Sequence, residues 1–521
     1  MDLLLLHPPA TKPAEPPLGL AVLAGHLRSQ GFTVAAIDAN LQAYLYLLDP
    51  ERAAAAAGAQ PATAVRRALG QCERSLQLLR SPAGVASFPR YATAVRHLQT
   101  LLELYTGADE RLNFGDYDHR RLSPFVPADL ARCAKGEVPT LFAGYFREQL
   151  LPEIARHRPR CIALSINYRH QLLPAFELAG LLARAFPEIP LIAGGGMLTS
   201  WREVLRHLEL HLLPFRHIVF GPGEGPLAQL LRAGGAAPYF LDGTTTCHTA
   251  DFADFPLCDY LSPLPVLPVS ASRGCYWGRC RFCPEASSPT HAYSAVAAGA
   301  FPELLLRLAA ETGVRRFHLT DNAIPVATLR ALAARADDLQ QLRWHGFVRF
   351  ERALLDGELV RGLARSGCTL LQLGLESGSQ AVLERMGKGT SLVDVAAILA
   401  QLKAAGIASY VYVMLGTPGE SPEEMAATED FLLRHADEIG FLNLALMNLP
   451  RDSDLASAAA PLLDEAAPLG LYRSLGDADR SAARRALTRL QQLPEIRTIL
   501  QRTPPYFTSN HAFFFPPSGQ S

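Results

Sequence analysis

Short apolar runs alternate with helix-like segments across residues 266–447, and this alternation constrains the fold more than any other feature of the chain. Strand-length runs separated by segments of helical periodicity indicate parallel strands joined by helical crossovers. The expected strands are 266–271, 315–319, 342–348, 369–375, 407–415 and 441–447. The expected helices are 302–310, 325–336, 354–366, 393–405 and 422–434. Parallel strands of this kind place working residues at their carboxyl ends.

The N-terminal half repeats the alternation with a second set of strands. These are expected at 3–6, 33–37, 161–166, 191–193 and 217–220, with helices at 18–30 and 174–186. Glycines follow two of the strands, at 194–196 and 221–225. The pattern predicts a doubly wound, Rossmann-like parallel sheet whose ligand crevice lies at the strand ends.

Changes in composition divide the chain into parts. Residues 1–240 are expected to form the sheet domain. Residues 46–158 within this domain are expected to form a helical insertion, because a stretch of this length is too long for a loop. The proline-rich residues 241–265 read as a linker, and 266–454 as the second α/β domain. Residues 455–521 are expected to form a small helical extension with an aromatic tail, whose three consecutive phenylalanines fold back on an apolar surface.

Charge and hydropathy exclude several classes of protein. With 521 residues and a net charge of −1, the chain has no basic field that would attract nucleic acid or an anionic membrane. The N-terminal apolar run is broken by proline too soon for a signal peptide. No run of about 18 apolar residues is free of charge, so no spanning helix is expected. The cysteines outside residues 275–283 show no pairing pattern, which indicates a reducing, cytoplasmic compartment.

Three cysteines, Cys275, Cys280 and Cys283, lie within nine residues. A structural zinc site usually takes four ligands, and an electron-transfer [4Fe–4S] cluster takes four thiolates. Three thiolates on a cubane leave one iron open for an exogenous ligand. The alternatives are a zinc site completed by Cys258 or His291, or three buried thiols.

This run resembles the cluster loop of radical S-adenosylmethionine (SAM) enzymes. The resemblance implies a [4Fe–4S] cluster whose open iron binds SAM, and reductive cleavage of SAM to a 5′-deoxyadenosyl radical. The family's usual gaps are three residues and then two, whereas here they are four and then two. Phe282 occupies the position of the family's aromatic residue beside the SAM adenine. The six expected strands then correspond to the family's partial (β/α)6 barrel.

The run 374–380, followed by 383–389, also resembles this family. The resemblance places Glu376 and Ser377 near the SAM ribose or methionyl group and Arg349 near its polar end. Gly416 and Thr417 would let the backbone approach the adenine. The alternatives are that Glu376 caps the following helix and that Arg349 forms a surface ion pair.

The N-terminal sheet resembles the cobalamin-binding domain that often precedes a radical SAM barrel. The resemblance implies cobalamin at the strand ends, without an axial histidine, because the Asp-x-His-x-x-Gly motif is absent. The alternative is an inherited Rossmann-like domain with no cofactor. The implied cofactor-binding residues are Asp38, Asn40, Gly194, Gly195, Gly196, Gly221, Gly223 and Glu224.

Together these features lead us to expect a cobalamin-dependent radical SAM methyltransferase that acts on an unactivated carbon of a peptide or natural product. An electron donor such as flavodoxin or ferredoxin is the expected partner, with no nucleic acid and no membrane. The alternatives are a radical rearrangement or cyclisation without methyl transfer, a tRNA methylthiotransferase-like enzyme, and a non-catalytic cobalamin or cluster sensor.

Overall fold

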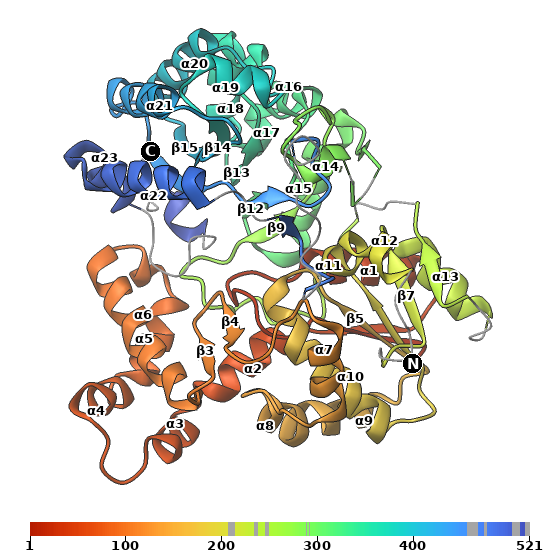
Figure 1. The fold of residues 1–521 in the computed structure, drawn as a ribbon. Coiled ribbons are helices and arrows are strands. Elements are labelled where there is room, and N and C mark those ends of the chain that lie inside the picture. The colour runs from red at the N-terminus through yellow and green to blue at the C-terminus, as the bar shows by residue number, and fades with distance from the viewer. Residues whose placement is uncertain are drawn as a thin grey trace. The chain divides into compact units, whose positions relative to one another are not determined.

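The computed structural model describes residues 1–206, 214–233, 238–244, 249–287, 289–290, 292–455, 467–473, 477–502 and 511–515. These residues form two compact units, one built on residues 1–265 and the other on the residues from 266 onward, with 467–469 and the backbone of 511–512 belonging to the first (Figure 1). Within the described ranges no helix has the length and apolar character needed to cross a membrane.

The first unit is built on a six-stranded, entirely parallel sheet. Its order is β2-β1-β5-β6-β7-β8, so the direction of winding reverses between β1 and β5. A reversal of this kind opens a crevice at the carboxyl ends of the two strands. The strands are β1 Leu3–Leu6, β2 Val34–Ile37, β5 Cys161–Ser165, β6 Leu191–Gly194, β7 His217–Phe220 and β8 Phe240–Asp242.

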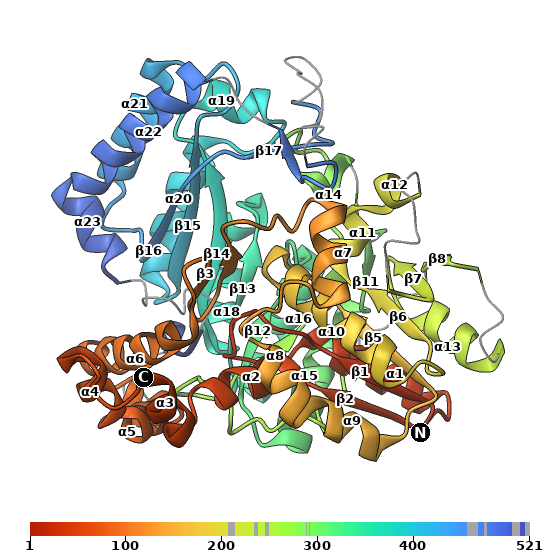
Figure 2. The same ribbon diagram turned by 60° about the horizontal axis from the view of Figure 1, so that its bottom comes forward.

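Helices of the first unit pack on this sheet and on one another (Figure 2). Helices α1 and α13 contact each other, and α10 contacts β6. All four leucines of β1 are fully buried or nearly so, as expected for a parallel strand covered on both faces. The helices are α1 Leu18–Ser29, α2 Ala39–Leu47, α10 Leu172–Ala185, α11 Gly196–Ser200, α12 Arg202–Leu205 and α13 Glu224–Ala233.

The insertion between α2 and β5 is mainly helical, as the sequence predicts. It also contains a β-hairpin, β3 Glu110–Leu112 with β4 Tyr117–His119, that the sequence did not predict. Helix α7 of the insertion packs against α10 of the sheet domain. The helices are α3 Pro50–Ala57, α4 Thr63–Leu69, α5 Cys72–Leu79, α6 Phe88–Leu102, α7 Pro127–Lys135, α8 Ala143–Tyr145 and α9 Leu151–His157.

Residues 251–260, within the predicted linker 241–265, are bound to the first unit. Asp251 and Asp254 both accept hydrogen bonds from Arg28 of α1, at 2.6 and 2.5 Å. Asp254 also accepts from the backbone N–H of Ala36 in β2, and Tyr260 donates to Asp38. Residues 251–260 therefore lie against α1 and β2 of the first unit.

The second unit is built on a six-stranded parallel sheet of order β16-β15-β14-β13-β12-β9. Strands β9 and β16 are its two edges, so the sheet is an open, partial (β/α)6 barrel. The strands are β9 Leu267–Val269, β12 Arg316–Leu319, β13 Arg343–Val348, β14 Cys368–Glu376, β15 Ala408–Leu415 and β16 Phe441–Leu446. All six expected strands are confirmed to within three residues at each end.

The barrel helices follow the expected order, with differences at α18 and α19 and a short extra helix, α17 (Ala336–Leu339). Helix α18 begins at Gly357, because Asp356 caps it by accepting from the N–H groups of Glu358 and Leu359. Helix α19 (Gln380–Arg385) was not predicted, and Ser379 caps it. The others are α15 Phe301–Thr312, α16 Val326–Ala334, α17 Ala336–Leu339, α20 Leu392–Ala404 and α21 Pro422–Arg434. The C-terminal helices α22 (Asp477–Gln492) and α23 (Pro494–Leu500) pack against β16 and α21.

Candidate functional site

The three clustered cysteines lie on a loop that a short strand pair closes at its base. Strand β10 (Ser272–Arg273) enters the loop and pairs antiparallel with β11 (Ser294–Ala295), which leaves it. Gly278, in the enlarged first gap, has φ +56°. Cys280 is buried, whereas Cys275 and Cys283 are half-buried. The loop therefore presents the three thiols with different access to solvent.

The cysteine loop is docked on the turn that follows α19. The indole N–H of Trp277 donates to the carbonyl of Gly387 at 3.2 Å, and the N–H of Arg281 donates to the carbonyl of Met386 at 2.8 Å. A Cβ at Gly389 would lie 2.3 Å from the ring of Trp277, so glycine is required for this approach. The run 383–389, which the sequence singled out without a role, is the platform for the loop.

Arg349 lies beneath the loop, next to one of its thiols. Its Nη1 is 3.7 Å from Sγ of Cys280, and its Nη2 donates to the carbonyl of Lys388 at 2.6 Å. Its Nε donates to Glu351 at 3.0 Å, and its guanidinium carbon lies 4.2 Å from the ring centroid of Trp277. With 6% of its surface exposed, Arg349 does not form the surface ion pair considered as an alternative.

Glu376 and Lys388 form a buried ion pair next to the loop. Lys388 Nζ lies 2.5 Å from Glu376 Oε1, and both residues are buried. Glu376 ends β14 at a bulge and has φ +69°, a left-handed conformation that is strained for a residue with a side chain. A Cβ at Gly374 would lie 2.3 Å from Glu376 Oε1, so the glycine makes room for the pair. Ser379 caps α19, so the alternative that Glu376 is the cap is wrong.

Two cations near Cys280 oppose the effect of burial on the pKa of its thiol. Burial raises the pKa of the Cys280 thiol, and the nearby cations Lys388 and Arg349 act in the opposite direction. Burial also raises the pKa of Cys283, to about 11. A metal that binds thiolates would meet two cations beside Cys280 that offset the negative charge of the thiolates.

Among the described residues, no group of three or more Cys, His, Asp or Glu side chains surrounds a single ion. A cubane cluster binds each thiolate at a different iron, whereas a mononuclear zinc site needs its ligands around one ion. Of the two candidate fourth zinc ligands, Cys258 is exposed in the first unit and His291 lies outside the described residues.

Phe282 packs beyond the end of β16. It contacts the buried cluster of Met447 and Leu449, and its ring lies 5.8 Å from Lys388 Nζ. The structure therefore brings four of the predicted residues to one region: Cys280, Phe282, Arg349 and Glu376.

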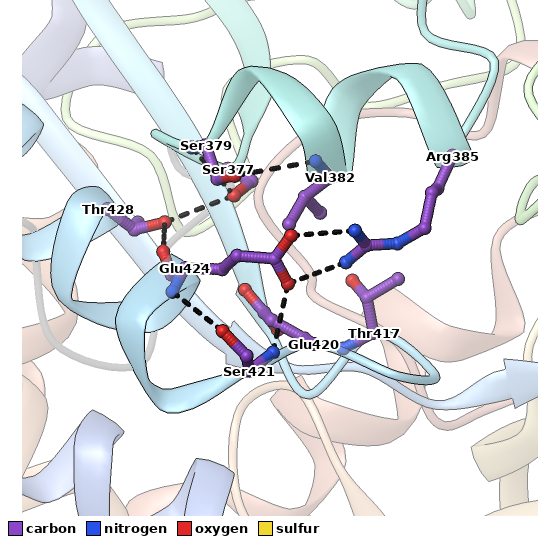
Figure 3. Close-up of polar contacts among 9 residues, drawn as sticks. All are labelled: Ser377, Ser379, Val382, Arg385, Thr417, Glu420, Ser421, Glu424 and Thr428. Atoms are coloured by element: carbon purple, nitrogen blue, oxygen red, sulfur yellow. Dashed lines mark hydrogen bonds and ion pairs between the residues drawn. The ribbon is translucent and has the colours of Figure 1, made fainter.

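Ser377 belongs to a different network, shown in Figure 3. Its hydroxyl lies 3.1 Å from that of Thr428 in α21, and it accepts from the N–H of Ser379. Glu424 of the same helix accepts from both Nη atoms of Arg385, at 2.6 and 2.7 Å (Figure 3). These bonds fix the β14–α19 connection and α19 onto α21, and Ser377 is fully buried within them.

The glycine-containing turn after β15 is closed by Glu420. The N–H groups of Gly416 and Thr417 both donate to Glu420 Oε2, at 2.7 and 3.0 Å. Burial raises the pKa of Glu420. Sequence reasoning missed Glu420, although a carboxylate three residues after a turn is a recognisable signal of this contact.

Asp321 holds the entry to the cysteine loop. It accepts from the N–H of Ala271 at 3.1 Å and from the hydroxyl of Ser272 at 2.6 Å. Because Asp321 follows β12, these bonds connect the end of β12 to the residues that follow β9. Burial raises the pKa of this carboxyl.

In the first unit, Asp38 and Asn40 lie at the end of β2. Asp38 caps α2 by accepting from the N–H of Leu41 at 3.0 Å, and Asn40 accepts from the N–H of Thr11 at 2.7 Å. Thr11 lies 3.1 Å from His7, which follows β1. Asn40 thus fixes the loop after β1, at the reversal point of the sheet, whereas Asp38 caps α2 and accepts from Tyr260.

The predicted glycines and Glu224 lie at the ends of β6 and β7. Gly195 has φ +108°, and a Cβ there would lie 2.4 Å from the carbonyl of Ile166. The N–H of Gly196 donates to Asn167, which follows β5, and Gly221, also with positive φ, donates to Thr199. The remaining predicted residues of this edge are Gly194 at the end of β6, Gly223, and Glu224 at the start of α13.

The polar loops after β1, β5, β6 and β7 therefore meet along one edge of the first sheet, where the sequence predicts a cofactor. The residues that sequence reasoning missed there are His7, Thr11, Asn167 and Thr199.

Comparison with known proteins finds a family match over part of the chain. Residues 269–432 match the model of the radical SAM superfamily. The tRNA-2-methylthio-N(6)-dimethylallyladenosine synthases from two strains of Treponema pallidum are each 28% identical over 108 residues. That match covers 20% of this chain and 24% of each relative's length.

Solved structures resemble the fold over most of the chain. The radical SAM methyltransferase TsrM from Kitasatospora setae, solved with cobalamin and a [4Fe–4S] cluster, has a TM-score of 0.53 at 16% identity, over 87% of this chain and 77% of that chain. The cobalamin-dependent radical SAM enzyme OxsB, solved with aqua-cobalamin and SAM, has a TM-score of 0.52 at 14% identity, over 84% of this chain and 52% of that chain. The chain thus has the fold of cobalamin-dependent radical SAM enzymes, and it contains a radical SAM superfamily domain.

Proposed function

We propose that this chain cleaves SAM reductively at a [4Fe–4S] cluster held by Cys275, Cys280 and Cys283. The observation that carries the proposal is the docking of the three-cysteine loop over two buried cations, Arg349 and Lys388. When bound, such a cluster supplies the electron that splits the SAM sulfonium into methionine and a 5′-deoxyadenosyl radical. The external electron donor in this proposal is a flavodoxin or ferredoxin.

The chain's own residues would act by positioning and by charge. Arg349 and the turn 386–389 hold the cysteine loop against the barrel sheet. The Glu376–Lys388 pair places a carboxylate and an ammonium close to Cys280. A zwitterionic ligand such as SAM needs groups of both charges at its binding site. Phe282 lies beside them as an apolar surface for the adenine.

We further propose that cobalamin binds along the carboxyl edge of the first sheet, where Gly194 to Gly196, Gly221 and Gly223 keep the backbone accessible. Cobalamin would supply the methyl carrier, and the product would be a substrate methylated at an unactivated carbon. The support is the fold shared with TsrM and OxsB, both of which were solved with cobalamin. A peptide or a peptide-derived natural product is the proposed substrate. The cytoplasm is the proposed compartment, because all eight described cysteines are free thiols.

A second candidate is a tRNA methylthiotransferase-like activity. The match to the Treponema synthases favours it. The match covers only 20% of this chain, and the net charge of −1 gives no overall positive charge that would attract RNA.

The test is anaerobic reconstitution of the full chain with iron, sulfide and hydroxocobalamin, followed by metal analysis. The proposal predicts about four irons per chain and one cobalt, and products heavier than the substrate by one methyl group. Iron without cobalt would overturn the cobalamin part. Zinc in place of iron would overturn the whole proposal.

A further inference from the structure

The barrel sheet has two faces with different surroundings. One face is covered by helices: Trp344 donates to Ser366 beside α18, and Val411 and Val413 of β15 are fully buried. The alternate residues on the same strands, such as Phe347 and Tyr412, are only half-buried. Because successive side chains of a strand point to opposite faces, these alternate residues line the inner face of the partial barrel.

Aromatic side chains form the middle of this inner face. The rings of Phe347 and Tyr412 lie 5.3 Å apart, and those of Tyr410 and Tyr412 lie 4.7 Å apart. Gln372, from the strand between them, donates to the hydroxyl of Tyr412 at 3.0 Å. Three neighbouring strands thus contribute one continuous wall of rings with an amide–phenol pair in it.

The chain's own C-terminal segment already occupies the lower part of the wall. Phe514 is buried, and its ring lies 5.7 Å from Tyr410, 5.2 Å from Phe441 and 5.5 Å from His345, all in edge-on contacts. Tyr410 is 2% exposed in this contact, whereas Tyr412, two residues nearer the carboxyl end, remains half-buried. The face therefore accepts an aromatic ring edge-on, and the open part is continuous with the occupied part.

The open part of the wall ends at the cysteine loop. Gly374 pairs in register with Tyr412, and it makes room for the Glu376–Lys388 pair. Arg349, two residues after Phe347, contacts Cys280. An occupant of the open part would thus lie between Phe514 and the proposed site of radical formation.

The charge of the inner face limits what it can bind. Arg349 and Glu376 lie at the carboxyl ends of their strands, and Arg316 and Arg343 lie at the amino ends of theirs. Between these two levels, the inward-facing residues of β12 to β16 include no carboxylate, ammonium or guanidinium group. A charged or phosphorylated group would lose its hydration there and meet no carboxylate, ammonium or guanidinium group.

We propose that this inner face is the substrate surface of the barrel and that it selects a neutral aromatic side chain, seated against Phe347 and Tyr412 with Phe514 as its floor. The inference rests on the proposed function and deepens it, because it gives the acceptor group of the peptide substrate a chemical class.

The test measures binding of small neutral probes to the full-length protein by titration calorimetry. N-acetyl-L-phenylalaninamide carries a ring, and N-acetyl-L-leucinamide is its aliphatic counterpart. The phenylalanine probe is expected to bind about tenfold more tightly than the leucine probe. Phe347→Leu should remove most of this preference. Trp344→Phe, on the opposite face of the same strand, is the matched control and should keep it.

A second variant tests the floor by a gain of binding. Phe514→Ala removes the ring next to Tyr410, so a larger probe, N-acetyl-3-(2-naphthyl)alaninamide, should bind about fivefold more tightly than to the wild type. This gain cannot arise from loss of folding. Equal affinities of the leucine and phenylalanine probes, or an unchanged preference in Phe347→Leu, would overturn the inference.

Failure here is distinguishable from failure of the proposed function. Probe binding needs neither iron nor cobalt, and it is measured on the protein before and after reconstitution. A reconstituted protein that cleaves SAM but shows no aromatic preference would overturn only the substrate inference. A protein that shows the preference but binds no iron would overturn only the proposed function.

Discussion

Lys388 and Glu376 form a buried ion pair with an Nζ–Oε1 distance of 2.5 Å, and the same lysine opposes the rise that burial causes in the pKa of the Cys280 thiol. Glu376 holds a left-handed conformation in this pair, and Gly374 leaves the space that the pair fills. Strain of this kind persists only where the surroundings determine it, and it gathers at functional sites. The pair therefore links the end of β14 to the cysteine loop.

Lys388→Met is expected to destabilise the second unit by about 3–5 kcal/mol, because it leaves the Glu376 carboxylate buried without its partner. Urea unfolding followed by tryptophan fluorescence measures the loss. The double variant Lys388→Met with Glu376→Gln should recover a large part of it. A single-variant cost below about 1 kcal/mol would show that the pair is solvated.

Gly374→Ala is expected to displace the same ion pair, because the added Cβ would lie 2.3 Å from Glu376 Oε1. Forced overpacking of this kind costs about 1–3 kcal/mol. Gly19→Ala, in helix α1 with no neighbouring atom within 4 Å, is the control and should be neutral or slightly stabilising. Equal unfolding midpoints for both variants would contradict the account.

Ser377→Ala tests whether Ser377 stabilises the fold or binds SAM. The structure bonds this hydroxyl to Thr428 and Ser379, so its loss should cost about 1–2 kcal/mol of stability and leave SAM affinity unchanged. Equilibrium dialysis of SAM against the reconstituted variant measures affinity, and urea unfolding measures stability. A large loss of affinity at unchanged stability would instead place Ser377 at the SAM ribose.

Glu177 makes the stability of the first unit depend on pH. Burial raises the pKa of this carboxyl from 4.5 to about 7, while hydrogen bonds from Thr140 act against the rise. Because the folded-state pKa lies above the unfolded value, folding favours the protonated form. Its contribution is complete below pH 4.5 and is lost as pH rises through 7.

Relative to Glu177→Gln, the wild type should therefore lose roughly 2.5 kcal/mol of stability between pH 5 and pH 8. Urea midpoints of both proteins across that range measure the difference. Parallel plots of urea midpoint against pH for the two proteins would show that Glu177 does not titrate between pH 5 and pH 8.

The sequence predicted the barrel strands well because parallel strands buried between helices are continuous apolar runs that end in polar residues. Strands 217–220 and 3–6 were predicted with the bounds that the structure shows. The hairpin β3–β4 was missed, because its two three-residue strands carry several charges and little apolar pattern. Helix α19 was missed because six residues are too few for a helical period.

The site was predicted in part for a similar reason. Cys275, Cys280 and Cys283 lie within nine residues of the sequence, so their spacing alone indicates a shared site. Lys388 lies twelve residues after its partner Glu376, across a helix, and no local pattern joins the two. The glycines on both sides of Lys388 could have indicated that this segment packs closely against another part of the chain. Gly389 does so, because it lets the backbone approach Trp277.

The most direct test of the central claim is the amount of 5′-deoxyadenosine formed when the reconstituted protein is reduced in the presence of SAM. The account predicts product from the wild type. It predicts neither product nor the iron–sulfur absorption from Cys275→Ala, whose first unit should remain folded. Product or bound cluster in Cys275→Ala, or no product from a wild type that carries about four irons per chain, would contradict it.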